Sequence, residues 1–275
     1  MSDLKKTSSC KMLKYIDDIR TCLFCVLCTF SYIFFWWHPS IIGFFLTSLQ
    51  AFQMSVIVHN CAHTSMFIDA WMNRVFQIIL TVLSGSPVTL YIPGHNESHH
   101  KHLESEKDMM RTSRMTYKHE SLNLLLFLPT VLCDIIENEQ NYMKEKKKIS
   151  SPIYVQYLRE SVIYHFFLMG LFFINWKKAL IVYFIPTLVG KYFIISLNML
   201  QHYKCDPSSK FNHSRNFTGP ILNFIFLNNG YHTMHHIAPG LHWSKLPMKH
   251  KEIESYIDVR LIHSNIFYYI YCAHF

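Results

Sequence analysis

Three short motifs hold most of the residues in this sequence that are able to do chemistry. They read HNCAH at residues 59–63, HNESHH at residues 95–100 and HTMHH at residues 232–236. Neutral imidazole binds iron, copper, zinc and nickel, so histidines this closely spaced are able to converge on one or two metal ions. The motifs lack the H-E-x-x-H of zinc proteases, and a histidine-only set differs from the glutamate-rich set of carboxylate-bridged bundles. They therefore predict a polyhistidine metal site.

The spacing within the first two motifs indicates how their side chains are shared. Residues four apart lie on one face of a helix, so His59 and His63 are predicted to point at the same metal. His95 and His99 repeat that spacing. His100 is turned by about 100° from His99, which suits a second metal or the other side of a dinuclear centre.

The third motif adds His232 and His235 as an i, i+3 pair, with His236 beside them, and His202 adds a further imidazole one turn after Asn198.

Because 18 of the 275 residues are histidine, one H-x-x-x-H pair is expected by accident. The two histidine triplets occurring together by chance is about a one in a hundred event. The triplets therefore carry more weight than the first motif.

The composition predicts a membrane protein. Half of the residues are hydrophobic and only 16% are charged, against about 25% in an ordinary soluble domain. The net charge of +8 comes from basic residues beside apolar segments, such as Lys144–Lys148, which is typical of a topology signal rather than of nucleic-acid binding. Nothing in the spacing of the eight cysteines suggests a disulfide framework.

The first 160 residues are predicted to form a cytosolic arm (residues 1–20), a helix hairpin (21–58) and a cytosolic or interfacial segment (59–160). Basic residues precede the first apolar run and none lies in the turn at His38-Pro39-Ser40, so the N-terminus is placed in the cytoplasm. Val75–Ile92 is interrupted by Ser84-Gly85-Ser86-Pro87, which favours a re-entrant or interfacial segment. Leu122–Cys133 is too short to span, and Asp134–Ser151 is expected to be a solvated loop.

A second hairpin is predicted for residues 161–200, with its turn at Trp176-Lys177-Lys178, followed by a cytosolic cap at residues 201–275 that carries the third motif. The predicted fold is thus a single all-α integral membrane domain over residues 1–275. Four transmembrane helices hold a cytosolic helical cap, and every histidine motif lies on one face of the membrane. The ligands lie beyond the helix ends, which argues against a metal transporter, whose ionisable ligands usually lie within the spans.

Several other polar residues have two open interpretations. Asp206 is either an acceptor for an imidazole N–H or a simple loop carboxylate. Asp108 and Arg111 are expected to form a solvated ion pair, with contact to a substrate headgroup as the alternative. His102 and His242 flank the motifs and are either interface or surface residues or neighbours of the metal site or of the substrate entrance, and His213 is open in the same way. The remaining histidines away from the motifs are predicted at the interface or surface; they include His38, His119, His165, His250, His263 and His274.

The order HNCAH, HNESHH, NMLQH and HTMHH resembles the membrane fatty acid desaturase superfamily over roughly Val58–Pro247. That superfamily includes desaturases, hydroxylases, ketolases and alkene-forming fatty acid decarboxylases. The resemblance implies two iron ions that activate O2 in a cytosolic cap, with Asn198 reaching a metal through water. The iron ligands that it implies are His59, His63, His95, His99, His100, His202, His232, His235 and His236.

The resemblance also implies the reaction class. An O2-dependent oxidation of a fatty acid, acyl thioester or acyl lipid is expected in the membrane, most frequently desaturation. Hydroxylation, ketolation and terminal-alkene formation use the same ligands, so these alternatives stay open. The sequence contains no H-P-G-G motif of a fused cytochrome b5 domain, so the two electrons are expected from a separate donor of ferredoxin or cytochrome b5 type.

Overall fold

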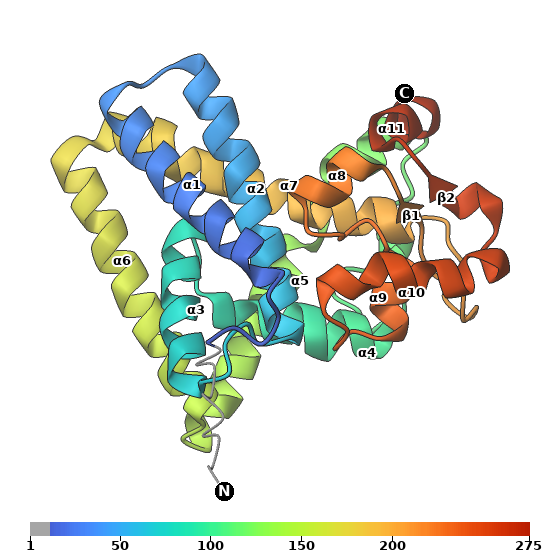
Figure 1. The fold of residues 1–275 in the computed structure, drawn as a ribbon, viewed down its shortest axis with the longest axis horizontal. Coiled ribbons are helices and arrows are strands. Elements are labelled where there is room, and N and C mark those ends of the chain that lie inside the picture. Colours follow the sequence, from blue (N-terminus) through green and yellow to red (C-terminus); the bar gives the residue numbers. More distant parts are fainter. Residues whose placement is uncertain (1–11) are drawn as a thin grey trace, which may run out of the picture.

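The computed structural model describes residues 12–275, and it is built almost entirely of helices (Figure 1). Residues 1–11 of the predicted cytosolic arm lie outside the described residues. The α-helices are α1 (Asp18–Trp37), α2 (Ile41–His63), α3 (Ala70–Ser84), α4 (His100–His102), α5 (Glu120–Lys148), α6 (Pro152–Lys178), α7 (Ile185–His202), α8 (Pro220–Ile225), α9 (His232–Ile237), α10 (Leu246–Ile253) and α11 (Ile266–His274).

Shorter elements connect these helices. A pair of two-residue parallel strands, β1 (Asn216–Phe217) and β2 (Ile262–His263), joins two parts of the C-terminal region. The 3₁₀ turns are η1 (Val88–Leu90), η3 (Thr112–Arg114), η5 (Trp243–Lys245), η6 (Glu254–Tyr256) and η7 (Val259–Leu261), and the π-helices are η2 (Ile92–His99) and η4 (Ala179–Phe184).

Three helices among the described residues are long and apolar enough to cross a membrane: Asp18–Trp37, Ile41–His63 and Pro152–His202. The number becomes four if the bent pair Ala70–Ser84 and Val88–His102 counts as one span. The third candidate has 51 residues, which is about 76 Å at 1.5 Å per residue and more than twice a hydrocarbon core of about 30 Å. Its backbone leaves helical geometry at Asn175, and α7 runs off in a new direction there (Figure 1).

The bend at Asn175 lies next to the predicted turn at residues 176–178, which agrees with two arms rather than one span. The first hairpin was also predicted, although α1 begins at Asp18 and α2 continues to His63. The first motif therefore occupies the last residues of α2. The total of four spans and the cytosolic position of the cap stay predictions.

A close contact between α2 and α7 places two of the histidine motifs side by side. Gly190 has no side chain, and a Cβ at this position would lie 2.6 Å from the backbone carbon of Ala51. Only glycine allows the two helices to approach this closely, which is typical of small residues at membrane helix interfaces. The α2 end that carries His59 is therefore held beside the α7 end that carries His202.

The predicted interruption near residues 84–87 is confirmed. α3 ends at Gly85, whose φ of +77° lies in the left-handed region, and the chain bends by 87° before η1. Polar side chains satisfy the freed backbone groups: Lys191 Nζ donates to the Gly85 carbonyl at 2.6 Å, and the Thr89 N–H donates to Glu160 Oε2 at 2.8 Å. A broken helix inside an apolar bundle needs such partners.

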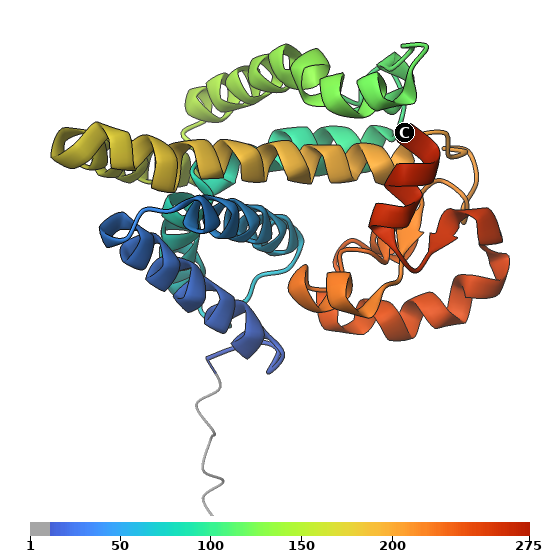
Figure 2. The same ribbon diagram turned by 90° about the horizontal axis from the view of Figure 1, so that it is seen from above.

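The predicted solvated loop at Asp134–Ser151 is wrong. Glu120–Lys148 forms one helix of 29 residues, α5, which lies alongside α7 (Figure 2). The second half is rich in Glu, Gln, Lys and Met, which are good helix formers, and its charge alone is no argument against a helix. Leu124, Phe127 and Val131 form the buried stripe of the first half.

Candidate metal centre

The nine histidines singled out in the sequence converge from four separate segments. They form two groups in the described residues, and the ligand atoms within each group lie within 4.8 Å of one another. The four segments are α2, η2 together with the start of α4, α7, and α9. The five-histidine group consists of His59, His63, His95, His100 and His235, and the four-histidine group consists of His99, His202, His232 and His236.

The ring nitrogens in each group point at a common centre. In the five-histidine group, the Nε2 atom of His235 lies 3.0 Å from that of His59 and 3.1 Å from that of His100. In the four-histidine group, the Nε2 atom of His202 lies 2.8 Å from that of His232 and 3.2 Å from that of His99. Two imidazole ligands at about 2.1 Å from a metal and at right angles to each other are about 3.0 Å apart. The spacing thus fits ligands around shared cations.

The histidines of the second motif are divided between the two groups differently from the prediction made from their spacing. His95 and His99 were predicted to point at one metal, but His95 and His100 share the five-histidine group and His99 belongs to the other. The reason is that Ile92–His99 is a π-helix in which the His100 N–H bonds to the His95 carbonyl. In a π-helix the hydrogen bonds run from i to i+5, and here the Nε2 atoms of His95 and His100, five residues apart, lie 3.1 Å from each other. Such turns are frequent at functional sites.

The third motif is divided as well. His232 and His236, four residues apart on α9, share the four-histidine group, whereas His235 faces the five-histidine group. The predicted i, i+3 pair of His232 and His235 therefore does not share a centre. The rings of His100 and His236 stack at 4.2 Å between centroids, which makes the two groups neighbours. Burial, followed by the neighbouring imidazoles, lowers the pKa of all three α9 histidines well below its usual value, so they are neutral.

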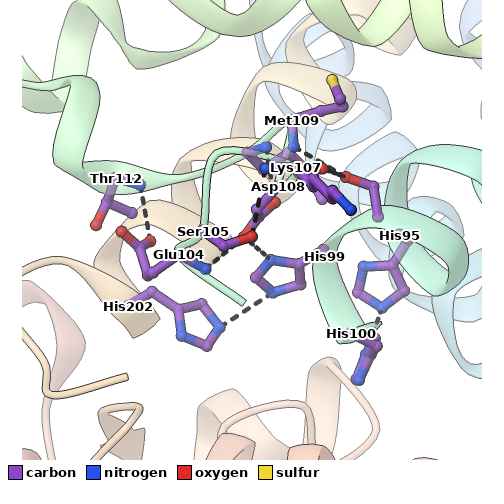
Figure 3. Close-up of polar contacts among 12 residues, drawn as sticks. His95, His99, His100, Glu104, Ser105, Lys107, Asp108, Met109, Thr112 and His202 are labelled. Atoms are coloured by element: carbon purple, nitrogen blue, oxygen red, sulfur yellow. Dashed lines mark hydrogen bonds and ion pairs between the residues drawn. The ribbon is translucent and has the colours of Figure 1, made fainter. Parts of the chain in front are cut away.

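A buried carboxylate orients one histidine of the four-histidine group. Asp108 Oδ2 lies 3.0 Å from His99 Nδ1 and also accepts the Glu104 N–H, while its Oδ1 accepts the Met110 N–H (Figure 3). Burial would raise the pKa of Asp108, but His99 and these hydrogen bonds hold it below its usual value, so the group is a carboxylate. The predicted ion pair with Arg111 is wrong: within residues 12–275, Asp108 pairs with His99.

Other imidazoles are oriented by backbone and amide groups. His202 Nδ1 lies 3.1 Å from the carbonyl oxygen of His213, and His59 Nδ1 lies 3.2 Å from Asn60 Oδ1. Such bonds fix the ring so that Nε2 faces the other imidazoles of its group. Of the two interpretations of Asp206, the loop carboxylate is the one found, because Asp206 is exposed and bonds to Ser208.

Arg215 holds the end of α7, a role that its position in the sequence does not reveal. Its buried guanidinium donates to the Leu200 carbonyl at 2.6 Å and to the Tyr203 carbonyl at 3.2 Å. These carbonyls are unsatisfied at a helix C-terminus, where a cation is favourable. His202, in the last turn of α7, is thereby held in place.

Asn198 lies on α7 one turn before His202, and its side chain is buried. Its Nδ2 finds no hydrogen-bond partner in the part of the chain that the structure describes. A water molecule is a natural partner for such an amide. Its link to a metal through water stays a prediction.

Two histidines outside the motifs are not where they were predicted. His250 and His274 are 2% and 3% exposed, so the prediction of surface or interface positions is wrong for both. His250 packs against Tyr231 just before α9, and His274 Nδ1 lies 3.1 Å from the Glu120 carbonyl oxygen at the start of α5, contacts that no local pattern reveals. His242 is buried too, but it belongs to neither histidine group.

Comparison with known proteins supports the same assignment. The family model described as fatty acid desaturase matches residues 33–264, a range that holds all nine histidines and Asn198. No curated protein sequence gives a significant match. Because the family model covers most of the chain and both histidine groups, the chain belongs to the fatty acid desaturase family.

Proposed function

We propose that the two histidine groups bind two iron ions and that the protein uses O2 to oxidise a fatty acyl chain. The donor set fits iron, because neutral imidazoles suit this metal and the Nε2 atoms of each group face one centre. The proposed iron ligands are His59, His63, His95, His100 and His235 for one ion and His99, His202, His232 and His236 for the other, with Asn198 acting through water.

The bound iron pair would supply dioxygen activation and oxidation of an unactivated C–H bond. The chain's own residues hold the ligands in position. Asp108 orients His99, the His213 carbonyl orients His202, and Arg215 fixes the end of α7 that carries His202. Burial lowers the pKa of the three α9 imidazoles well below its usual value and keeps them neutral, which is the state that a metal ligand needs.

Desaturation, which introduces a C=C bond, is the reaction that we propose for this site. The same ligands support a second outcome, hydroxylation or ketolation, and a third, loss of the carboxyl group to give a terminal alkene. The substrate is a fatty acid, an acyl thioester or an acyl lipid. Two electrons come from a separate donor of ferredoxin or cytochrome b5 type.

The protein is proposed to be a multi-pass membrane protein with the N-terminus and the metal centre on the cytoplasmic side. The support is that the apolar helices α2 and α7 end at His63 and His202, which belong to the two histidine groups. A metal transporter would place its ligands within the spans instead. The convergence of nine histidines from four segments is the single observation that carries the proposal.

Metal analysis of the purified protein tests this proposal most directly. About two irons per chain are expected, and His235→Ala is expected to lower the iron content and abolish product while the protein stays in the membrane. His165→Ala is the matched control, because His165 is exposed on α6 and bonds only to the Ser161 carbonyl among the described residues. Zinc or no metal in the wild-type protein would contradict the proposal.

Expression in a lipid-producing host separates the reaction outcomes. Mass spectrometry of lipids and headspace hydrocarbons distinguishes new unsaturated chains from hydroxy or keto acids and terminal alkenes by mass. Desaturation predicts acyl chains lighter by two hydrogens. Hydroxylated products, or alkenes shorter by one carbon, would replace desaturation with one of the other outcomes.

A further inference from the structure

The start of α1 is tied to the segment after the third motif by a buried carboxylate. Asp18 is 4% exposed, and its Oδ2 lies 3.2 Å from His242 Nε2. Its Oδ1 accepts hydrogen bonds from Trp243 Nε1 and from Thr21 Oγ1, both at 3.0 Å. Asp18 and His242 thus form a carboxylate–imidazole pair that belongs to neither histidine group.

The second nitrogen of His242 faces the surface. His242 Nδ1 lies 2.9 Å from Ser244 Oγ, and Ser244 is half-exposed. The ring is held in this orientation by Tyr15, which stacks on it at 3.9 Å between centroids. Ser244, His242 and Asp18 therefore make a continuous line of hydrogen-bonding groups that runs from the surface inward. An imidazole bonded at both nitrogens is able to take a proton on one and release it from the other.

The inner end of this line opens into a small cavity beside the five-histidine group. The cavity of about 20 Å³ is lined by Asp18 and His242 as well as by His63 and His235. Its volume has room for one water molecule. Asn60 also lines it, and the Asn60 Nδ2 has no hydrogen-bond partner within the described ranges. The cavity is thus polar enough to hold a water between the carboxylate and the histidines.

We propose that Ser244, His242 and Asp18 form the path by which protons reach the metal centre. The inference rests on the proposed function, whose stoichiometry needs protons: one CH2–CH2 unit, one O2, two electrons and two protons give one C=C bond and two waters. Hydroxylation needs two protons as well, and gives one alcohol and one water. Imidazoles that bind a metal through Nε2 are neutral and supply neither proton.

Each transfer follows a hydrogen bond in the structure. A solvent proton arrives at His242 Nδ1 by way of the Ser244 hydroxyl, and the proton on His242 Nε2 passes to Asp18 Oδ2. Asp18 then releases a proton to a water for which the cavity has room, and that cavity is also lined by His63 and His235. The imidazole returns to its first tautomer before the next proton. The path delivers two protons per turnover, while the external donor supplies the two electrons.

Three variants of the full-length protein test the path. Asp18→Asn and His242→Ala break the path, whereas Thr21→Val removes one hydrogen bond to the same carboxylate but leaves the path intact. Product formation is measured in host membranes, whose own acyl chains and electron donor supply the reaction. Iron per chain and the unfolding temperature are measured on the purified proteins.

Asp18→Asn and His242→Ala are expected to slow product formation on the order of 10²-fold and to increase the solvent deuterium isotope effect. Their iron content is expected to match that of Thr21→Val, which keeps wild-type turnover within about 2-fold, whereas their unfolding temperature is expected to be lower because each breaks a buried pair. Imidazole in the buffer is expected to restore His242→Ala in part. 1-Methylimidazole, which cannot carry a proton on both nitrogens, is expected to have no effect.

A purely structural role gives a different result. Thr21→Val as slow as Asp18→Asn, loss of iron in both path variants, or equal rescue by both imidazoles would overturn the proton path. If Asp18→Asn fails to fold, the rescue of His242→Ala by imidazole but not by 1-methylimidazole still tests whether protons follow this path. Failure of the proposed function itself is distinguishable, because the wild-type protein would then give no oxidised chains at all.

Discussion

At the scale of single residues, Asp108 shows how a carboxylate outside the histidine motifs orients an imidazole of the four-histidine group. It lies nine positions after His99, yet the loop folds back and both side chains are fully buried. Glu104 stabilises the loop, because its carboxylate accepts the N–H of Thr112 at 2.7 Å (Figure 3). Partners of this kind orient an imidazole and raise its basicity.

Asp108→Asn is therefore expected to weaken iron binding at the four-histidine group. Loss of such a partner typically lowers metal affinity or activity about 10- to 100-fold. Iron per chain after dialysis against a weak chelator measures the effect. The control is Asp206→Asn, because Asp206 is an exposed carboxylate that bonds to Ser208. Equal iron retention in both variants would show that His99 needs no carboxylate.

His250 is a buried residue whose removal is expected to help stability. Neither ring nitrogen has a hydrogen-bond partner among the described residues, and burial lowers the pKa of His250 below its usual value. The unfolded chain therefore binds a proton at this imidazole at about pH 6.5, whereas the folded chain does not. The free energy of unfolding consequently falls as the pH drops below that value.

His250→Leu is expected to remove this acid penalty. The unfolding temperature should be unchanged or higher at pH 7.5, and the advantage over wild type should grow at pH 5.5. His119→Leu, at an exposed histidine before α5, is expected to change neither value. Destabilisation of His250→Leu at both pH values would mean that a bound water satisfies the imidazole.

At the scale of elements, the π-helix η2 decides which histidine serves which group. Its i to i+5 pattern brings Nε2 of His95 to within 3.1 Å of Nε2 of His100, while His99 belongs to the other group. The bend before it is fixed by charged side chains from other helices: Glu160 of α6 accepts the Thr89 N–H, and Lys191 of α7 donates to the Gly85 carbonyl.

An alanine inserted after Glu97 is expected to destroy the centre. His95 and His100 would then lie six positions apart, and neither an α-helix nor a π-helix stacks such residues. We expect the iron content to fall to about half or less, while the protein still inserts in the membrane. The control is Glu97→Ala, which removes only an exposed ion pair with Lys101. Full iron content in the insertion variant would exclude His95 as a ligand.

At the scale of the whole molecule, the metal centre joins segments that are far apart in the chain. His59 and His235 meet across 176 positions, and His99 and His202 across 103. A cation shared by these imidazoles would hold the distant segments together more strongly than the contacts between the rings do. Bound metal is therefore expected to contribute to the stability of the whole bundle.

Removal of iron with a chelator is expected to lower the unfolding temperature in detergent. Ligand at 1,000 times its dissociation constant stabilises a protein by about 4 kcal/mol, which for a chain of this size corresponds to about 10 °C. His235→Ala, which lacks one ligand, is expected to show a smaller drop on chelation. An unfolding temperature that does not change on chelation would mean that the histidine groups are held by packing alone.

Much of this architecture is readable from local patterns. The apolar runs predict α1, α2, α6 and α7, because a membrane span needs a continuous apolar stretch, and the residues at 84–87 predict the interruption after α3. The histidine motifs predict the family, which the family model confirms. Local patterns failed at α5, whose charged half was read as a loop although its residues are good helix formers.

The residue types by themselves determined which chemistry this protein is suited to. Nine histidines, most of them in three short motifs, predict a metal site, and the long apolar runs predict a bundle of membrane helices. Only the tertiary structure decided which histidine belongs to which group. The grouping depends on a π-helical turn, and the spacing of the motifs does not reveal whether a turn is α-helical or π-helical. The tertiary structure also decided the partners, Asp108 for His99 and Asp18 for His242, because hydrogen bonds across a fold depend on distances that sequence separation does not encode.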